Sequence, residues 1–511
     1  MKQVESNNFT EIFYDDTEIS HQNSVPDESI DIEYLKTILP GDTRADFFDY
    51  LSKADCKNVK IWAIPEGTVV FPRVPLIVVE GPLAICQLLE TTLLNLVNYA
   101  SLIATNAARC RLAAGASKEL LEFGLRRAQG PNGGLSASKY AFVGGSSESY
   151  FVEGFDGTSN VIAGKLFAIP VRGTHAHSYV SSFQAKDLCI AKPLVNSSDE
   201  RNVANLTDLA IDFRRILVEK DIFHSVILDE VNDGELAAFI SYAQCFPNGF
   251  LALVDSYDVL RSGIVNFCAC VLALDSLDYK AKGVRIDSGD LAYLSREIRR
   301  IFIAISEKFN IPYVSKLKIL ASNDLNEDTI YSLNEQGHEI DCFAVGTHLV
   351  TCQKQPALGC VYKLVELNNT ARIKLSEDID KVVLPGRKRC YRLYGKDGRI
   401  INDLLALENE ISPVEGTPIL CRHPFLDAKR AYVVPKSVKL LHQLYWNGES
   451  TEESSEFLID KKQRVEDSLK ELRSDIKRPL NPTPYKISVT ESLHKFFHQL
   501  WQENAPIGRL E

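Results

Sequence analysis

The segment PVRGTHAHSYV, residues 170–180, places two histidines two positions apart. If this apolar run is a strand, side chains two apart project from one face, so His175 and His177 can face the same cavity. An H-x-H pair can also bind a metal, but no H-x-x-E or cysteine pair nearby supplies a third ligand. Two interpretations remain: a hydrogen-bonded histidine lining a strand end, or a histidine with a nucleophilic or acid–base role.

Two arginines stand directly before a glycine-rich stretch. Arg126 and Arg127 precede the segment AQGPNGGLSASKYAF. Guanidinium groups match phosphate or carboxylate with paired donors, and glycine lets the backbone approach such an anion. The pattern favours an anion site, and a solvated helix face is the alternative for the two arginines.

The segment GVRIDSGDLAYLSREIRRIF, which begins at Gly283, combines a strand with an amphipathic helix. Strand spacing puts Arg285 and Asp287 on one face, and the start of the next helix offers unpaired N–H groups suited to a phosphate. The Asp287 carboxylate could accept ribose hydroxyls or bind Mg²⁺ through water. A second phosphate-contacting turn is expected at Gly346 and Thr347. Together these residues predict a sugar-phosphate pocket.

Apolar runs alternate with helical segments between about residues 160 and 350, and the candidate residues follow these runs. Such alternation predicts parallel strands with crossover helices, in a barrel or in a doubly wound sheet, and in both folds the chemistry collects where the strands end. Taken singly, Asp258, Asp290 and Asp324 are equally well explained as helix N-caps. The runs are LFAIPVRGT, FLALVDS, GVRIDSGD, KILASND and CFAVGT.

The flanking segments have a different pattern. Before the repeat we expect strands in VKIWAI and VPLIVVEG and a long, amphipathic, buried helix from Pro82 to about Ala114. Beyond residue 355, the sequence again has the pattern of strands joined by turns, in GCVYKLVEL, KRCYRLYGKDGRI and AYVVP. An acidic linker, a charged helix near 461–476 and a last helix with apolar Leu493, Phe496, Phe497 and Leu500 follow.

The composition is that of a globular chain. Its 511 residues are 45% hydrophobic and 24% charged, enough for two or three domains, which excludes disorder as the main character. The net charge is −11 and no basic stripe is interleaved with aromatics, so we expect no nucleic acid and no membrane as partner. The N-terminus lacks an apolar core segment and the twelve cysteines lack C-x-x-C pairs. We therefore expect a cytosolic protein with reduced thiols, with Cys268 and Cys270 in the core.

Six motifs in one order resemble nicotinate phosphoribosyltransferase of the animal type, from about Asp31 to the C-terminus. They are FGLRRAQGPNGGLSASKYAFVGG, GTSNVIAG, VRGTHAHSYV, VRIDSGDL, ASNDLNE and FAVGTHLVTC. The resemblance implies transfer of a phosphoribosyl group from 5-phosphoribosyl 1-diphosphate to nicotinic acid, which gives nicotinate mononucleotide and diphosphate for NAD synthesis. It also implies ATP as a coupled co-substrate and Mg²⁺ or Mn²⁺ as cofactor.

The resemblance also implies roles for individual residues. His177 matches the histidine of the family's G-T-x-A-H-S motif, which ATP phosphorylates, whereas His175 falls on the variable position and is expected to be a bystander. Thr174 and Arg285 match contacts to nicotinate. Asp287 is similar to the carboxylate that holds the ribose hydroxyls.

Further residues match phosphate contacts or the choice of substrate. Thr347 matches a contact to the ribose phosphate, and Arg126, Asn323 and Gly346 resemble other phosphoribosyl or phosphate contacts. Ser159 stands where the related nicotinamide enzyme has an aspartate; its hydroxyl can donate to nicotinate, which a carboxylate would repel. No metal ligands are assigned.

The family fold is a type II phosphoribosyltransferase: an irregular TIM-like α/β barrel with an α/β sandwich domain built from the N- and C-terminal segments. It is typically a homodimer with shared active sites. The resemblance thus predicts an atypical, disordered N-terminus at 1–30 and the first part of the sandwich with the long helix at 31–115. The barrel is expected at 116–354, and the segment completing the sandwich, with a helical tail, at 355–511.

One family motif has no clear counterpart. Family members begin with a pattern like D-x-Y-x-L-T-M, whose tyrosine stacks on the pyridine ring in the other subunit; DIEYLKTIL, with Tyr34, imitates it but aligns better with a later helix. A non-catalytic or impaired paralogue acting as a binding or dimerisation partner is therefore the alternative function. A barrel enzyme acting on quinolinate or nicotinamide is a third possibility. The intact His177, Arg285 and Asp287 favour the nicotinate enzyme.

Overall fold

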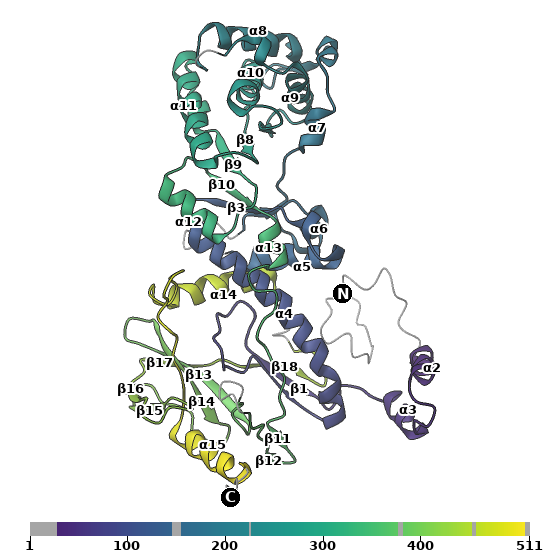
Figure 1. Ribbon diagram of the computed structural model, residues 1–511, viewed down its shortest axis with the longest axis vertical. Coiled ribbons are helices and arrows are strands. Elements are labelled where there is room, and N and C mark those ends of the chain that lie inside the picture. The colour runs from purple at the N-terminus through teal and green to yellow at the C-terminus, as the bar shows by residue number, and fades with distance from the viewer. Residues whose placement is uncertain (1–27, 146–154, 224–225, 377–381, 452–455, 506–511) are drawn as a thin grey trace, which may run out of the picture. The chain divides into compact units, whose positions relative to one another are not determined.

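The computed structural model describes residues 28–145, 155–223, 226–376, 382–451 and 456–505 (Figure 1). The chain forms two compact units: a central unit, Ala100–Pro356, and a terminal unit that combines Met1–Tyr99 with Ala357–Glu511. An α/β central unit and a second unit assembled from both ends of the chain confirm the predicted fold class. Residues 1–27 of the segment expected to be disordered lie outside the described residues, and helix α2 begins at Glu28.

A six-stranded sheet forms the centre of the central unit, in the order β4-β3-β10-β9-β8-β7. Every neighbouring pair is parallel, so the six carboxyl ends lie at one edge of the sheet, as the alternating sequence pattern predicts. Within the described residues β4 and β7 are the two edge strands, so the sheet is a half-barrel. The strands are β3 (Glu119–Glu122), β4 (Gly157–Thr158), β7 (Leu251–Leu253), β8 (Gly283–Ile286), β9 (Lys318–Ala321) and β10 (Cys342–Val345).

Helices cover this sheet because most of its strand residues are buried and apolar. All four residues of β10 are buried. Helix α11 (Leu291–Phe309) packs against β9 through a buried stripe that includes Ile298, Phe302 and Ile305, and Figure 1 shows it alongside β8 and β9. Helix α10 (Ile264–Asp275) is almost entirely buried and includes Cys268 and Cys270, which confirms their predicted core packing. All twelve cysteines are free thiols.

The remaining elements of the central unit are mostly short. The long helix predicted from Pro82 is α4 (Leu83–Ala114), whose last part belongs to this unit. The other helices are α5 (Gly130–Gly144), α6 (Val161–Phe167), α7 (His177–Ser181), α8 (Leu206–Glu219), α9 (Asp233–Cys245), α12 (Glu327–Gln336) and α13 (Thr347–Thr351). Single turns are η1 (Leu125–Arg127), η2 (Ala185–Cys189), η3 (Leu228–Glu230), η4 (Val259–Gly263) and η5 (Val314–Lys316), and a separate pair is β5 (Pro193–Val195) with β6 (Val203–Asn205).

Two local predictions need correction. The run LFAIPVRGT is not a strand: its first residues end α6, and Pro170, which has no N–H to donate, leaves only a bridge between Val171 and Thr158. Asp258 and Asp290 do cap η4 and α11, but α12 is capped by Asn326, while Asp324 has a left-handed backbone.

The terminal unit contains a six-stranded mixed sheet in the order β16-β15-β19-β14-β13-β17 and a three-stranded sheet in the order β18-β1-β2. Of the predicted strand segment GCVYKLVEL, only Glu366–Leu367 forms a strand, β11. The strands are β1 (Lys60–Ala63), β2 (Ile77–Glu80), β11, β12 (Thr370–Ala371), β13 (Lys388–Tyr394), β14 (Ile400–Leu407), β15 (Ile419–Arg422), β16 (Arg430–Val433), β17 (Ser437–Leu440), β18 (Gln443–Asn447) and β19 (Ile487–Val489). The helices are α2 (Glu28–Ile38), α3 (Ala45–Leu51), α14 (Leu458–Glu471) and α15 (Glu491–Asn504).

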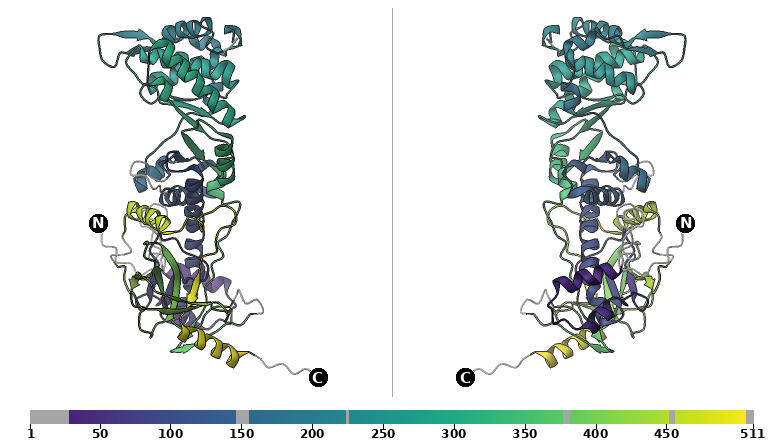
Figure 2. Two further views of the ribbon diagram at one scale, coloured as in Figure 1. Left: turned by 90° about the vertical axis from the view of Figure 1, so that its left-hand side faces the viewer. Right: turned by 90° about the vertical axis from the view of Figure 1, so that its right-hand side faces the viewer.

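The last helix closes one face of the larger sheet. In both side views α15, coloured yellow, lies beside the green strands, and it packs against β14 and β15 (Figure 2). Leu493 and Phe497 are fully buried in the core that it forms with the sheet. The same unit also buries an ion pair between Arg392 Nε and Asp403 Oδ1, 2.8 Å apart. Among the described residues no helix has the length and apolar character needed to span a membrane.

Candidate active site

The candidate active site lies at the carboxyl edge of the parallel sheet, where polar residues follow several strands. Parallel connectivity alone brings these positions to one edge, although they are far apart in sequence. His177 is the first residue of α7, beyond the bridge at Val171. The residues that follow the strands are Ser159 after β4, Asp255 after β7, Asp287 after β8, Ser322 and Asn323 after β9, and Gly346 and Thr347 after β10.

His177 contacts two carboxylates at this edge. Its Nε2 lies 3.4 Å from Asp287 Oδ2 and 3.9 Å from Asp255 Oδ1, and its Nδ1 lies 3.4 Å from Ser256 Oγ. The His177 side chain is 46% exposed, whereas that of Asp255 is 2% exposed. An Nε2–H that donates to Asp287 leaves the lone pair on Nδ1, so the ring offers a nucleophilic nitrogen on an accessible side chain.

Asp255 supports this pair and keeps one oxygen without a donor. Its Oδ2 accepts hydrogen bonds from Asp287 N at 3.1 Å and from Ser288 Oγ at 2.5 Å, which fixes the turn after β8. Its Oδ1 is buried and has no hydrogen-bond partner among the described residues. Leaving a buried hydrogen-bond acceptor unpaired costs about 1–3 kcal/mol of stability. A second carboxylate, that of Asp287, lies at the end of the neighbouring strand, β8. A free oxygen in a pair of acidic side chains suits a hard cation such as Mg²⁺.

Arg285 is the cation of the site, and its side chain is only 14% exposed. Its Nε donates to Ser322 Oγ at 3.0 Å, while one terminal nitrogen lies 3.4 Å from Thr174 Oγ1 and the other lies 3.5 Å from Asp287 Oδ2. The guanidinium also lies over the ring of Phe123, 5.7 Å from its centroid. The hydrogen bond from Nε fixes the position of the side chain, whereas the contacts of the two terminal nitrogens are long. The pair of terminal nitrogens can therefore bind an anionic ligand.

His175 has a structural environment that differs from that of His177. It is buried against the rings of Tyr179, Phe239 and Tyr242. Its Nε2 accepts a hydrogen bond from Leu253 N at 3.2 Å, and burial lowers the pKa of the imidazole to about 4. His175 is therefore neutral at pH 7 and holds the end of β7 in place.

Ser159 belongs to a turn that Glu122 organises. The Glu122 carboxylate accepts hydrogen bonds from Gly124 N, from Ser138 Oγ at 2.9 Å and from Thr158 Oγ1. Ser159 N and Oγ both point to the Glu122 carbonyl oxygen, at 3.0 and 3.4 Å. The buried Glu122 thus fixes the ends of β3 and β4 relative to each other and places the Ser159 hydroxyl at the carboxyl edge.

The other four predicted residues share the edge without joining the cluster. Arg126, Asn323 and Thr347 are exposed, and none of the four makes a hydrogen bond or ion pair with Arg285, Asp287 or His177 in the part of the chain that the structure describes. Gly346 lies where β10 approaches β3: a Cβ there would come within 3.2 Å of the Phe123 carbonyl oxygen. Their roles as phosphate contacts therefore remain predictions.

Comparison with known proteins decides the family. The chain is 53% identical over 489 residues to nicotinate phosphoribosyltransferase 1 of Arabidopsis thaliana, covering 95% of this chain and 85% of the relative. It is 41% identical over 477 residues to nicotinate phosphoribosyltransferase of Homo sapiens, covering 93% and 86%. The chain belongs to the nicotinate phosphoribosyltransferase family. The alternative of a non-catalytic paralogue receives no support from these relatives.

Structure and domain comparisons agree with membership of the nicotinate phosphoribosyltransferase family. The crystal structure of human nicotinic acid phosphoribosyltransferase matches with a TM-score of 0.81 at 39% identity, covering 92% of this chain and 88% of that chain. The family's N-terminal domain matches residues 16–98 and its C-terminal domain matches residues 387–497. The similarity thus begins at residue 16, which corrects the expected start at about Asp31.

The sequence alone assigns no role to two residues of this candidate site, Asp255 and Ser322. Asp255 follows its apolar run just as Asp287 does, so the signal was present, but the sequence does not show which strand ends face His177. Ser322 immediately precedes Asn323 in ASND, and its hydroxyl joins Arg285 to Asp287. Only the order of the strands in the sheet reveals that connection.

Proposed function

We propose that this protein transfers the phosphoribosyl group of 5-phosphoribosyl 1-diphosphate to nicotinate, forming nicotinate mononucleotide and diphosphate. The observation that carries the proposal is the convergence of His177, Asp287 and Arg285 at one sheet edge, in a chain that aligns over more than nine-tenths of its length with relatives named for this activity. A histidine, paired carboxylates and a buried guanidinium are the groups that a pyridine carboxylate and a sugar diphosphate require.

Arg285 and Thr174 bind nicotinate in this proposal. The loosely held guanidinium nitrogens turn from Thr174 and Asp287 to the two oxygens of the substrate carboxylate and form a bidentate pair. The ring of Phe123 lies beside that guanidinium and provides an apolar wall for the pyridine. Ser159 donates to the carboxylate from the β4 edge. An amide substrate forfeits the charge pairing with Arg285, so the site favours the acid.

Asp287 and Asp255 act on the phosphoribosyl donor. Asp287 accepts the ribose hydroxyls, and the free Oδ1 of Asp255 with the Asp287 carboxylate would hold Mg²⁺, directly or through water. Bound there, Mg²⁺ neutralises charge on the leaving diphosphate. Thr347, Gly346, Arg126 and Asn323 contribute the remaining phosphate contacts. The protein thereby positions the pyridine nitrogen against C1 of the ribose while the bond to diphosphate breaks.

His177 couples ATP to the reaction in this proposal. Asp287 accepts the Nε2 proton, so Nδ1 attacks the γ-phosphorus of ATP; the bond from that phosphorus to the β–γ bridging oxygen breaks and ADP leaves. The phosphohistidine places a dianion beside Asp255 and Asp287, and this repulsion changes which diphosphate arrangement is favoured. Hydrolysis of the phosphohistidine restores the free imidazole.

The proposal includes a cytosolic homodimer with shared active sites. Three residues of α6, which directly follows Ser159, expose apolar side chains: Val161 at 65%, Ile162 at 55% and Leu166 at 37%. A second subunit covering them would complete the pocket next to β4. Light scattering of the purified protein should give twice the chain mass, and Ile162→Asp should yield monomer with reduced activity. A fully active wild-type monomer would contradict this part.

The acceptor is tested by competition. The full chain, given equal amounts of nicotinate, nicotinamide and quinolinate with 5-phosphoribosyl 1-diphosphate and Mg²⁺, should yield nicotinate mononucleotide as the dominant product by mass spectrometry. If nicotinamide mononucleotide is the dominant product, the protein uses nicotinamide and not nicotinate as its acceptor. A quinolinate-derived product would place it with the enzymes that also decarboxylate their acceptor.

The role of His177 is tested by label transfer. ATP labelled at the γ-phosphate should leave acid-labile label on the wild-type protein and none on His177→Ala. Ser181→Ala is the matched control, because Ser181 is exposed on the same helix and, among the described residues, its hydroxyl donates a hydrogen bond only to the Ser178 carbonyl oxygen. Label retained on His177→Ala would refute the phosphohistidine at this position.

A further inference from the structure

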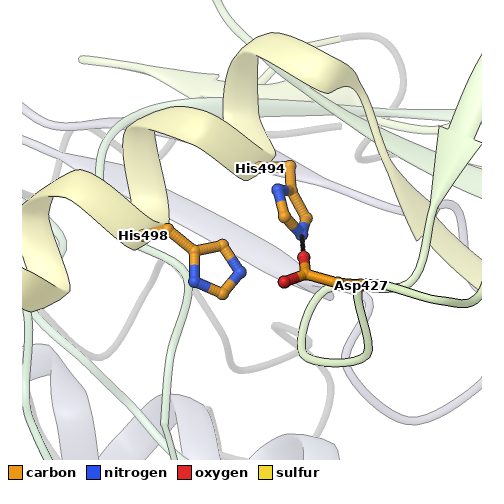
Figure 3. A group of neighbouring side chains, drawn as sticks. All are labelled: Asp427, His494 and His498. Atoms are coloured by element: carbon orange, nitrogen blue, oxygen red, sulfur yellow. Dashed lines mark ion pairs between the residues drawn. The ribbon is translucent and has the colours of Figure 1, made fainter.

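The terminal unit contains a second group of ligand-type side chains, outside the central unit that carries the candidate active site. His494 and His498 lie one turn apart on α15, and both face Asp427 (Figure 3). One potential ligand atom from each of the three residues lies within 4.8 Å of the others. His494 Nε2 is 3.1 Å from Asp427 Oδ1. Two imidazoles at positions i and i+4 with a carboxylate form a common donor set for zinc.

Both elements that present these side chains are well fixed. Helix α15 is anchored by Leu493 and Phe497, which are fully buried, and its first turn is capped by Thr490. Asp427 lies on the turn between β15 and β16, where His423 Nδ1 accepts hydrogen bonds from Phe425 N and Leu426 N at 3.1 Å. A ligand set on a packed helix and a hydrogen-bonded turn needs little ordering when an ion binds.

Each of the two imidazoles has a buried nitrogen without a well-aligned hydrogen-bond partner. Nε2 of His498 and Nε2 of His494 are buried, and neither makes a hydrogen bond among the described residues; His494 Nε2 lies 3.1 Å from Asp427 Oδ1, but not in hydrogen-bond geometry. The His494 residue is only 5% exposed. Buried polar nitrogens without partners call for an explanation, and a bound ion provides one.

The charged neighbours are compatible with a cation. Arg422 lies 3.4 Å from Asp427 Oδ1, but its other terminal nitrogen is paired with Glu491 Oε2 at 2.8 Å. Arg422 therefore keeps a carboxylate partner if Asp427 turns to an ion. Lys495 lies 3.2 Å from Glu491 on the same helix. Lys429 is two positions from Asp427 on the turn, and Arg73 lies over the ring of Phe425 on that turn. Acidic and basic groups therefore both lie near the site.

We propose that Asp427, His494 and His498 bind a divalent transition-metal ion of the zinc class, with water as the fourth ligand. Nitrogen donors favour zinc over Mg²⁺, which prefers oxygen. Tetrahedral zinc with bonds of about 2.1 Å holds its ligand atoms about 3.4 Å apart, so ligand atoms that lie within 4.8 Å of one another need to close by at most about 1.4 Å. The exposed Asp427 side chain, on its turn, supplies most of that movement. The ion would tie the β15–β16 turn to α15.

The test is metal binding by the full chain after treatment with EDTA and dialysis. Titration with Zn²⁺ should show a site that is lost or weakened by at least about tenfold in His498→Ala, because even residues that only support metal ligands contribute that much affinity. Co²⁺ at the same site should give the visible absorption of a tetrahedral complex. Gln499→Ala, an exposed neighbour on the same helix, should bind like the wild type.

Two further variants keep the outcome interpretable. Asp287→Asn removes a carboxylate of the candidate active site, so a zinc site that survives Asp287→Asn but not His498→Ala belongs to the terminal unit. Asp427→Asn alters an exposed side chain, and Zn²⁺ should raise the melting temperature of the wild type but not of this variant. Equal Zn²⁺ affinity in the wild type, His498→Ala and Asp427→Asn would overturn the proposal, as would the absence of micromolar binding by the wild type.

Discussion

Replacing Arg285 should weaken binding of nicotinate more than binding of 5-phosphoribosyl 1-diphosphate. The Arg285 stem is held by Ser322 at 3.0 Å, whereas the contacts of its terminal nitrogens to Thr174 and Asp287 are 3.4 and 3.5 Å long. Both terminal nitrogens can therefore exchange these long contacts for the substrate carboxylate. Each charge-assisted hydrogen bond contributes about 1.5 kcal/mol at the lower end of its range, so the pair contributes about 3 kcal/mol.

The measurement is steady-state kinetics of Arg285→Gln and Arg285→Lys. A loss of about 3 kcal/mol corresponds to a rise of about 150-fold in KM for nicotinate in Arg285→Gln. Arg285→Lys keeps the charge but loses the paired guanidinium donors, and we expect its KM for nicotinate to rise about tenfold. Arg300→Gln, on the exposed face of α11, is the control and should leave both KM values near the wild type.

The same variants can be examined with nicotinamide as acceptor. Nicotinamide lacks the carboxylate, so Arg285→Gln should change the KM for nicotinamide little. The preference for nicotinate over nicotinamide should therefore fall by the same factor by which the KM for nicotinate rises. If Arg285→Gln raises the KM for 5-phosphoribosyl 1-diphosphate instead, or leaves the acid preference intact, the assignment of Arg285 to nicotinate is refuted.

Three further perturbations follow from the structure. Asp255→Asn should raise the Mg²⁺ concentration needed for half-maximal rate, and an unchanged Mg²⁺ titration would exclude Asp255 as a ligand. His175 is neutral in the fold with a pKa of about 4, below the ordinary value of 6.5, so its contribution to stability is complete above pH 6.5 and is lost as the pH falls toward 4. Urea unfolding should therefore show the wild type losing up to about 3 kcal/mol relative to His175→Gln across that window, and parallel pH profiles would contradict this. Asp403→Asn leaves the buried Arg392 without its counter-ion and should lower the free energy of unfolding by about 3–5 kcal/mol; a loss below about 1 kcal/mol would show that the pair behaves like one at the surface.

Much of the candidate site follows from the alternation of apolar runs and helical segments. Because that alternation predicts parallel strands, the residues after β7, β8 and β9 are expected at one carboxyl edge even though they lie far apart in sequence. That His177 faces them there is not, because the run before it forms no strand. The two histidines do not share one face, as strand spacing would require: His175 turns toward β7 and the aromatic rings, while His177 begins a helix at the edge.

Other features depend on contacts that no local pattern reveals. The segment LFAIPVRGT forms only a single β-bridge where a strand was expected. Its first residues belong to α6, and Pro170 has no N–H with which to make a hydrogen bond to a neighbouring strand. The roles of Asp255 and Ser322 depend on β7, β8 and β9 being neighbours. The group of Asp427 with His494 and His498 joins a turn to the final helix, and only the packing of α15 on its sheet brings them together.

The coupling of ATP to phosphoribosyl transfer through His177 is tested by the formation of nicotinate mononucleotide from nicotinate, 5-phosphoribosyl 1-diphosphate and Mg²⁺, with and without ATP, by the wild type and His177→Ala. We expect product from the wild type, stimulation by ATP, and loss of that stimulation in His177→Ala with basal activity remaining. No product from well-folded wild-type protein, or full ATP stimulation without His177, would contradict it.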